Sequence, residues 1–387
     1  MMDRIGQLLG LFLKLGVTAF GGPAAHIAMM EDEVVTRRGW MTRERFLDLI
    51  GATNLIPGPN STEMAIHIGF VRAGIVGLVV AGVSFILPAA LLTLGCAWVY
   101  DRFQTVPQAE ALLYGIKPAV IAVILSAVWR LGKTAAKGPF LIGIGFLVMV
   151  LVLFGINEII ALLGGGIVGV LWQLGSRLGK GEMLLGFVWL PSSNLALSVT
   201  AAPSSSVTLS SLGLFFLKIG CVLFGSGYVL IAFLQGGLVE QYQWLTQQQL
   251  LDAVAIGQFT PGPVLTTATF IGYVLAGPLG ALVATLGIFG PSFLFVLATN
   301  PLIPRLRQSA VAGAFLDAVN ASAIGLMAAV TVELARHTLI DWEAKQIDWG
   351  AGLIALVSAV VLFRYKVNSA WLVLGGAAIG WLLKTVT

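Results

Sequence analysis

The stretch Asn54-Leu55-Ile56-Pro57-Gly58-Pro59-Asn60-Ser61-Thr62 interrupts a long apolar run and decides how the chain folds. Proline lacks the backbone N–H that a helix needs, clashes with the preceding turn and pushes the residue before it out of the α region. A helix that reaches Pro57 must therefore end, and a new helix can begin after Pro59. A second break, Gln258-Phe259-Thr260-Pro261-Gly262-Pro263-Val264-Leu265-Thr266, lies 204 residues further on.

The composition is that of a membrane protein with many crossings. Of the 387 residues, 58% are hydrophobic and 10% are charged, whereas soluble domains carry about 25% charged residues. Apolar runs of about 20 residues, enough to cross a bilayer, recur along the chain. We therefore predict an all-α polytopic protein in the lipid bilayer, with about 10–14 crossings and no nucleic-acid partner. Within lipid, breaks of this kind are tolerated where they are buried in protein or line a wet cavity.

The two breaks belong to an internal repeat. Phe12-Leu13-Lys14-Leu15-Gly16 is matched by Phe216-Leu217-Lys218-Ile219-Gly220, and Phe20-Gly21-Gly22 is matched at the same offset by Phe224-Gly225-Ser226. After a one-residue deletion the offset becomes 203, as in the match of Pro88 with Pro291. We predict two homologous halves, residues 1–178 and 211–387, joined by a Pro/Ser-rich linker over 179–210.

The loop charges predict that the two halves are inserted in opposite directions. The loop after the first apolar segment contains Arg37, Arg38, Arg43 and Arg45, whereas its second-half counterpart, residues 240–249, contains no Lys or Arg. By the positive-inside bias the first loop is cytoplasmic and the second is not. Inverted repeats with sites built from broken helices near the midplane are typical of secondary transporters.

The break also predicts local boundaries. We expect Thr42 to cap the helix that ends near Ile56. The piece after the break should run to about Val80, and the next span should cover 82–100. The corresponding second-half pieces are expected at 264–278 and 280–299.

The helices that begin after the two breaks are candidate anion sites. Their first N–H groups have no partner within the helix, and the helix dipole places partial positive charge there. Inverted symmetry would bring the two N-termini face to face, where they suit a tetrahedral oxyanion; alternatively, the breaks serve helix packing. The residues of the predicted site are Lys14, Gly21, Gly22, Asn54, Pro57, Gly58, Pro59, Asn60, Ser61 and Thr62 in the first half, and Lys218, Gly225, Ser226, Gly227, Gln258, Thr260, Pro261, Gly262, Pro263, Thr266 and Thr267 in the second.

Charged residues inside the apolar runs need a specific reason. Lys14 and Lys218 are matched, and each costs roughly 2.5–3.5 kcal/mol at mid-bilayer unless it finds a partner. They are either counter-charges for an anion or side chains that extend toward an interface. Glu63 and His67 are four residues apart and share a helix face. We predict them as proton carriers, the alternative being that Glu63 is a favourable negative charge in a first helical turn.

Other charged positions and motifs yield fewer roles. Arg72, Lys117 and Arg130 are interpreted as topology anchors, and Asp317 has no evident partner. The sequence contains no complete phosphate-binding loop, zinc motif or serine elbow, so we predict no cofactor, no metal and no enzymatic activity. A membrane-embedded enzyme, the alternative of another class, would need an ordered acid/base or metal cluster.

The motifs Phe20-Gly21-Gly22-Pro23, Glu31-Asp32-Glu33, Trp40 and Pro57-Gly58-Pro59 resemble those of the chromate ion transporter family, and the two-half chain resembles its long members. The resemblance implies an inner-membrane secondary transporter that exports chromate, uses the proton gradient and confers chromate resistance. Sulfate, a structural mimic of chromate, is the other candidate ligand, by uptake or exchange; a homodimer is left open. The second half departs from the pattern at Ser226, Gly227 and Val264-Leu265.

Overall fold

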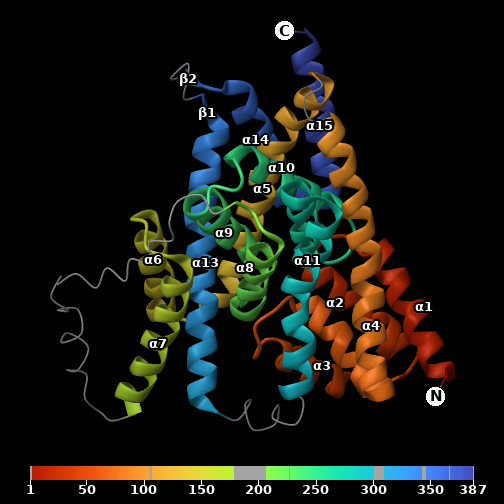
Figure 1. Cartoon of the computed structure of the whole chain (residues 1–387). Coiled ribbons are helices and arrows are strands. Elements are labelled where there is room, and N and C mark those ends of the chain that lie inside the picture. Colours follow the sequence, from red (N-terminus) through yellow and green to blue (C-terminus); the bar gives the residue numbers. More distant parts are fainter. Residues whose placement is uncertain are drawn as a thin grey trace.

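The computed structural model describes residues 2–103, 107–177, 206–225, 227–299, 309–341, 346–365 and 367–386. In these ranges the chain is almost entirely helical, apart from the two-residue strands β1 (Ile340–Asp341) and β2 (Gln346–Ile347), which pair antiparallel. Figure 1 shows one elongated helical bundle with the N- and C-termini at opposite ends. Five of the described helices are long and apolar enough to cross a membrane. The all-α polytopic fold is confirmed.

The element order repeats from one half to the other, down to a short π-helix in each. The first half contains α1 (Met2–Thr18), α2 (Pro23–Glu31), η1 (Asp32–Arg37), α3 (Arg43–Thr53), α4 (Asn60–Phe103), α5 (Pro107–Ala135), α6 (Pro139–Leu153) and α7 (Glu158–Arg177). The second half contains α8 (Leu209–Val222), η2 (Gly227–Val229), α9 (Leu230–Leu234), η3 (Gln235–Gln241), α10 (Gln247–Phe259), η4 (Val264–Thr266), α11 (Thr267–Thr299), α13 (Ala310–Leu339), α14 (Trp349–Tyr365) and α15 (Ser369–Val386).

The helices that lead into the two breaks begin in the same way. The Thr42 hydroxyl accepts a hydrogen bond from the Arg45 N–H at 3.3 Å, which confirms the predicted cap of α3. Thr246 caps α10 by accepting from the Gln249 N–H at 3.1 Å. Each cap satisfies one of the free N–H groups at the start of its helix.

The helix after each break folds back on itself, which corrects the predicted boundary near Val80. Ala73 and Gly74 leave the helical conformation, with φ +63° at Gly74. Beyond this turn the backbone of Gly77 contacts Gly69, so α4 is a hairpin of a short arm, residues 60–72, and a long arm, residues 75–103. The sequence around this turn contains no proline, so the predicted boundary was placed too late.

The second half contains the same hairpin. In α11 the turn lies at Ala276 and Gly277, with φ +64° at the glycine. Gly272 packs against Gly280 and Ala284, where a Cβ on Gly272 would lie 2.7 Å from the Ala284 Cβ. Here Pro278 follows the turn, and the predicted boundary between 278 and 280 is close to the observed one.

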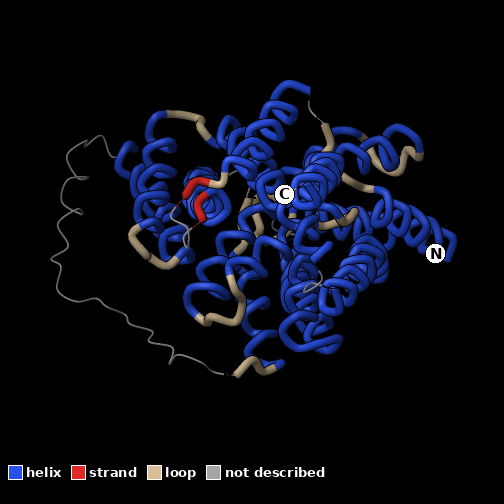
Figure 2. The backbone as a smooth tube through the Cα atoms, turned by 90° about the horizontal axis from the view of Figure 1, so that it is seen from above, coloured by secondary structure: helices blue, strands red, loops and turns tan. Residues whose placement is uncertain are grey.

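The two halves interlock rather than lying side by side. The α5 helix of the first half packs against α14 and α15 of the second, and α13 packs against α6 and α7 of the first. Small residues allow the close approach: the backbone of Gly115 on α5 contacts that of Gly376 on α15, and Gly325 on α13 contacts Gly145 on α6. Seen from above, helices make up nearly the whole molecule (Figure 2).

Candidate functional site

The two Pro-Gly-Pro breaks are each bonded to the other half. The Gly58 N–H donates to the Leu223 carbonyl at 2.7 Å, and the Gly262 N–H donates to the Ala19 carbonyl at 2.8 Å. Ala19 and Leu223 are matched positions, each directly after the first helix of its half. Both breaks therefore lie where broken helices of the two halves meet, the arrangement in which transporters place their substrate sites.

Polar side chains surround the first break. Gly58 adopts φ +144°, and a Cβ there would meet the Glu63 carboxylate and lie 2.6 Å from the Ser292 Oγ. At the second break Gly262 adopts φ +86°, and its Cβ would lie 2.6 Å from the Cβ of Ala89. Ala89 and Ser292 are matched positions, so the two breaks occupy equivalent grooves with different side chains.

The helix after the first break buries polar groups with few partners. Glu63 and His67 are fully buried. The Ser292 hydroxyl faces the Glu63 carboxylate. Among the described residues, the two carboxylate oxygens of Glu63 have no hydrogen-bond partner of good geometry, and the same holds for the two ring nitrogens of His67. Burying such groups without partners is costly, so this face of α4 is a place where a proton or a ligand would be accommodated.

The second break carries hydroxyl groups instead. The Thr93 hydroxyl, from the long arm of α4, lies 3.4 Å from the Thr260 Oγ1 and 3.2 Å from the Thr266 Oγ1. The positions matched to Thr93 and Thr260 are Val296 and Ile56, which lie in one small apolar cluster beside the first break. The sequence predicted Thr260 and Thr266 but missed Thr93, which pairs with the break only through the tertiary fold.

A cavity of about 380 Å³ reaches the first break. Asn54 and Asn60 line it, and the Asn60 Nδ2 donates to the Asn54 Oδ1 at 2.8 Å. Gly225 and Asn320 line it from the second half, and a Cβ on Gly225 would lie 3.2 Å from the Asn320 Oδ1. Three predicted residues, Asn54, Asn60 and Gly225, therefore share one cavity.

The glycine breaks also approach the other half or the Pro-Gly-Pro segments. A Cβ on Gly22 would lie 3.4 Å from the Tyr228 hydroxyl, and one on Gly227 would lie 3.0 Å from the Leu265 Cδ1. The Thr267 hydroxyl donates to the Val264 carbonyl at 2.8 Å. Of the remaining predicted residues, Ser61, Thr62 and Gln258 are buried, Gly21 adopts φ +105°, and Ser226 lies outside the described residues.

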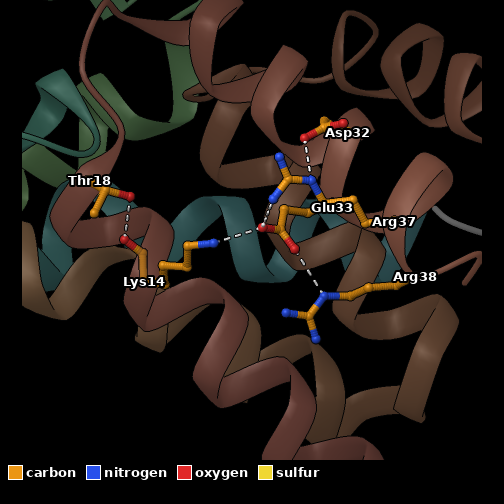
Figure 3. Close-up of polar contacts among 6 residues, drawn as sticks. All are labelled: Lys14, Thr18, Asp32, Glu33, Arg37 and Arg38. Atoms are coloured by element: carbon orange, nitrogen blue, oxygen red, sulfur yellow. Dashed lines mark hydrogen bonds and ion pairs between the residues drawn. The ribbon is translucent and has the colours of Figure 1, made fainter.

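Lys14 lies in a network of ion pairs (Figure 3). Its Nζ is 2.8 Å from the Glu33 Oε1, while the Arg38 Nε is 3.1 Å from the Glu33 Oε2. The Lys14 hydrogen bond, helped by Arg38 and opposed by burial, lowers the pKa of Glu33 below its ordinary value. Lys218 has its own carboxylate neighbour, Glu158, in a small cavity beside α7. Both matched lysines therefore have an acidic residue nearby, and a direct role in anion binding stays a prediction.

The structure shows partners for two charged residues, Lys117 and Asp317, that the sequence could not pair. Lys117 is buried, with its Nζ 3.5 Å from the Asp252 Oδ1, and the Tyr100 hydroxyl donates to the Asp252 Oδ2 at 2.9 Å. Asp317 forms an ion pair of 2.7 Å with Lys137. Both pairs join residues of different halves, which no local pattern could indicate. In the part of the chain that the structure describes, no three His, Cys, Asp or Glu side chains are grouped to hold a metal ion.

Comparison with known proteins identifies the relatives of this chain. A family model described as chromate transporter matches residues 6–170 and 210–381. The chain is 34% identical over 382 residues to the chromate transport protein of Cupriavidus metallidurans, covering 96% of this chain and 91% of that protein. It is 32% identical to the probable chromate transport protein of Synechococcus elongatus, covering 91% and 89%, and 28% identical to an uncharacterized transporter of Methanocaldococcus jannaschii, covering 96% and 92%. No solved structure matches the chain.

Proposed function

The chain belongs to the chromate transporter family, and from this premise we propose that it is a proton-coupled secondary transporter that exports chromate across the inner membrane and so confers resistance. The observation that carries the proposal is the reciprocal pair of hydrogen bonds from Gly58 to Leu223 and from Gly262 to Ala19. Each break is bonded to the opposite, inverted half, so a shift of one half against the other changes both breaks at once.

The breaks supply the groups that bind the anion. The first N–H groups of the helices after Pro59 and Pro263 carry partial positive charge. The cavity that Asn54 and Asn60 line gives access to the first break. At the second break the hydroxyls of Thr260 and Thr266 donate to backbone carbonyls. Among the described residues, the Thr93 hydroxyl donates only to these two hydroxyls, so it is the group that would turn to an oxygen of a tetrahedral dianion. This assignment adds Thr93 to the predicted set of site residues, which already came from both halves.

Proton coupling falls to Glu63 and His67. Both are buried on one face of the short arm of α4, and Glu63 lies directly beside the break at Gly58. A carboxylate next to an anion site would repel the anion, and its protonated form would not. Uptake of a proton by Glu63 therefore favours anion binding at the first break, so one proton leaves the cell with each dianion and one net negative charge crosses the membrane. His67, one turn further along the helix, passes protons to Glu63.

The membrane potential favours export over uptake. Moving one charge across 100 mV is worth about 2.3 kcal/mol, so a dianion that leaves a negative interior together with one proton gains about 2.3 kcal/mol. Uptake of the same dianion would have to overcome this energy with additional protons. The arginine-rich loop before α3 places that end of the bundle in the cytoplasm by the positive-inside bias.

The proposal is tested by chromate accumulation in cells that express the wild-type chain, Glu63→Gln or the control Lys133→Gln, at matched levels of protein in the membrane. We expect the wild-type chain and Lys133→Gln to lower accumulation and Glu63→Gln to lower it much less. Higher accumulation in cells with the wild-type chain would show uptake instead of export. Unchanged accumulation, together with sulfate movement in the same cells, would assign the transporter to sulfate.

A further inference from the structure

A second polar cavity, of about 220 Å³, lies at the opposite end of the α5–α13 pair from the first. The first cavity uses the C-terminal part of α5 and the N-terminal part of α13, around the Lys137–Asp317 pair. The second uses the other end of each helix, together with α10, α14 and α15, the elements labelled in the upper part of Figure 1. Its polar lining includes Tyr114, Lys117, Gln248, His337, Asp348 and Lys384.

The inverted repeat relates the two cavities residue by residue. At the offset of 203 that matches Pro88 with Pro291, Tyr114 corresponds to Asp317 and Lys117 to Asn320. Thr134 corresponds in the same way to His337. In each case one member of the pair lines the first cavity and the other lines the second. The two cavities are therefore equivalent parts of the repeat, and they lie at opposite ends of the α5–α13 pair.

The charged residues that line the two cavities differ. Three basic side chains, Lys117, His337 and Lys384, line the second cavity, and Lys117 pairs with Asp252. The first cavity is lined by one basic side chain, Lys137, which pairs with Asp317. The one carboxylate in the lining of the second cavity, Asp348, accepts the Tyr114 hydroxyl at 2.6 Å and the Ala351 N–H at 2.9 Å. These bonds hold its charge at the start of α14.

Lys117 is the most deeply placed of the three basic groups. Its side chain is 10% exposed, and its Nζ lies 3.5 Å from the Asp252 Oδ1. Charge-assisted N–H···O bonds are usually about 2.7–2.9 Å long, so this pair is loose. Asp252 is held independently by the Tyr100 hydroxyl. The ammonium group can thus turn toward a ligand in the cavity while Asp252 keeps a donor.

We propose that the second cavity binds a divalent tetrahedral oxyanion, with Lys117 as its buried ligand and the side chains of His337 and Lys384 as further N–H donors. This site is not part of the proposed function. Only the choice of the anion rests on that function. The second cavity lies at the opposite end of the bundle from the first. An exported dianion is held in it before release, and an external dianion competes for the same site.

The test measures binding of radiolabelled sulfate to the purified full-length protein in lipid nanodiscs. We expect Lys384→Gln to weaken binding several-fold and the charge-balanced double variant Lys117→Gln/Asp252→Asn to weaken it at least tenfold. Lys133→Gln, at the other end of α5, is the matched control and should bind as the wild-type chain does. Equal affinity and stoichiometry in all variants would overturn the proposal and leave the Lys117–Asp252 pair a packing feature.

A labelling experiment places the bound anion without relying on a variant of the ion pair. Thr338 lines the second cavity, so Thr338→Cys should react with a membrane-impermeant maleimide, above the background from Cys96 and Cys221 in the parent chain. Sulfate should slow this labelling, and Lys384→Gln should remove the protection. Labelling that sulfate does not affect would contradict the site. Sulfate protection in a chain that transports no chromate would retain this site and reject the proposed function.

Discussion

The Gly58 N–H donates a 2.7 Å hydrogen bond to the carbonyl of Leu223, a residue of the opposite half. Its symmetry mate runs from Gly262 to Ala19 at 2.8 Å. In each case a proline precedes the donor and another follows it, so the glycine carries the single N–H of the Pro-Gly-Pro segment. The break thus does more than end a helix. Its one N–H group donates to the residue that directly follows the first helix of the other half.

Replacing Gly58 by alanine should slow transport strongly. Its φ of +144° disfavours any L side chain, and the new Cβ would meet the Glu63 carboxylate and the Ser292 hydroxyl. Strain of this kind costs on the order of 1–3 kcal/mol. We expect a lower melting temperature and at least a tenfold lower rate of chromate transport in vesicles. Gly95→Ala, where the added methyl meets nothing within 4 Å, is the control, and equal effects of both variants would dismiss the argument.

Glu63→Gln should flatten the pH dependence of transport while the protein still folds. Glutamine has nearly the shape of glutamate and cannot exchange a proton, and the position is fully buried. We expect transport that no longer responds to an imposed pH gradient. Initial rates in vesicles between pH 5.5 and 8.5 measure this, with the exposed Glu44→Gln as the control. A wild-type profile in Glu63→Gln would move the coupling role to another group.

The fold could be predicted from the sequence because its signals are strong and repeated. Two Pro-Gly-Pro segments, runs of residues matched at an offset of 204 and then 203, and asymmetric loop charges each indicate one feature of an inverted repeat. The turn at Ala73-Gly74 was missed because a glycine that adopts a positive φ leaves no pattern in one sequence. The equivalent turn of the second half, at Ala276-Gly277, is followed by Pro278, and the boundary predicted for it is nearly right.

The site could be predicted in part. Asn54, Asn60 and Gly225 were expected and lie on one cavity. Thr93 and Ser292 were not expected, because each reaches its break from a distant segment of the chain. The pairing of Lys117 with Asp252 was missed for the same reason. Such contacts depend on how the two halves interlock, which periodicity and spacing do not encode.

Protonation of the Glu33 carboxylate should make the protein less stable in acid. Its pKa is lowered from 4.5 in the folded chain by Lys14 and Arg38, so the folded state holds this proton less tightly than the unfolded state. The contribution is fully present above about pH 4.5 and is lost as the pH falls through the lowered pKa. We expect Glu33→Gln to melt at a lower temperature at pH 7 and to lose less stability on acidification. Thermal melts from pH 7 to pH 3.5 test this, and parallel curves for the two proteins would contradict it.

Thr93→Val should weaken chromate binding at the second break. Valine keeps the shape of threonine and removes the hydroxyl that lies beside Thr260 and Thr266. A hydrogen bond to a charged group is worth about 1.5–3 kcal/mol, so the KM for chromate should rise by about tenfold or more while kcat changes less. Initial rates over a range of chromate concentrations separate the two quantities.

The inverted repeat supplies the matched control for this prediction. Val296 occupies the position equivalent to Thr93 and lies in an apolar cluster with Ile56 and Ile66. Val296→Thr places a hydroxyl at the first break, where it costs about 1–3 kcal/mol of stability if it stays unbonded. We expect this variant to melt earlier without a lower KM. If Thr93→Val and Val296→Thr changed the KM equally, the two breaks would act alike, and the hydroxyl cluster would have no special part in binding the anion.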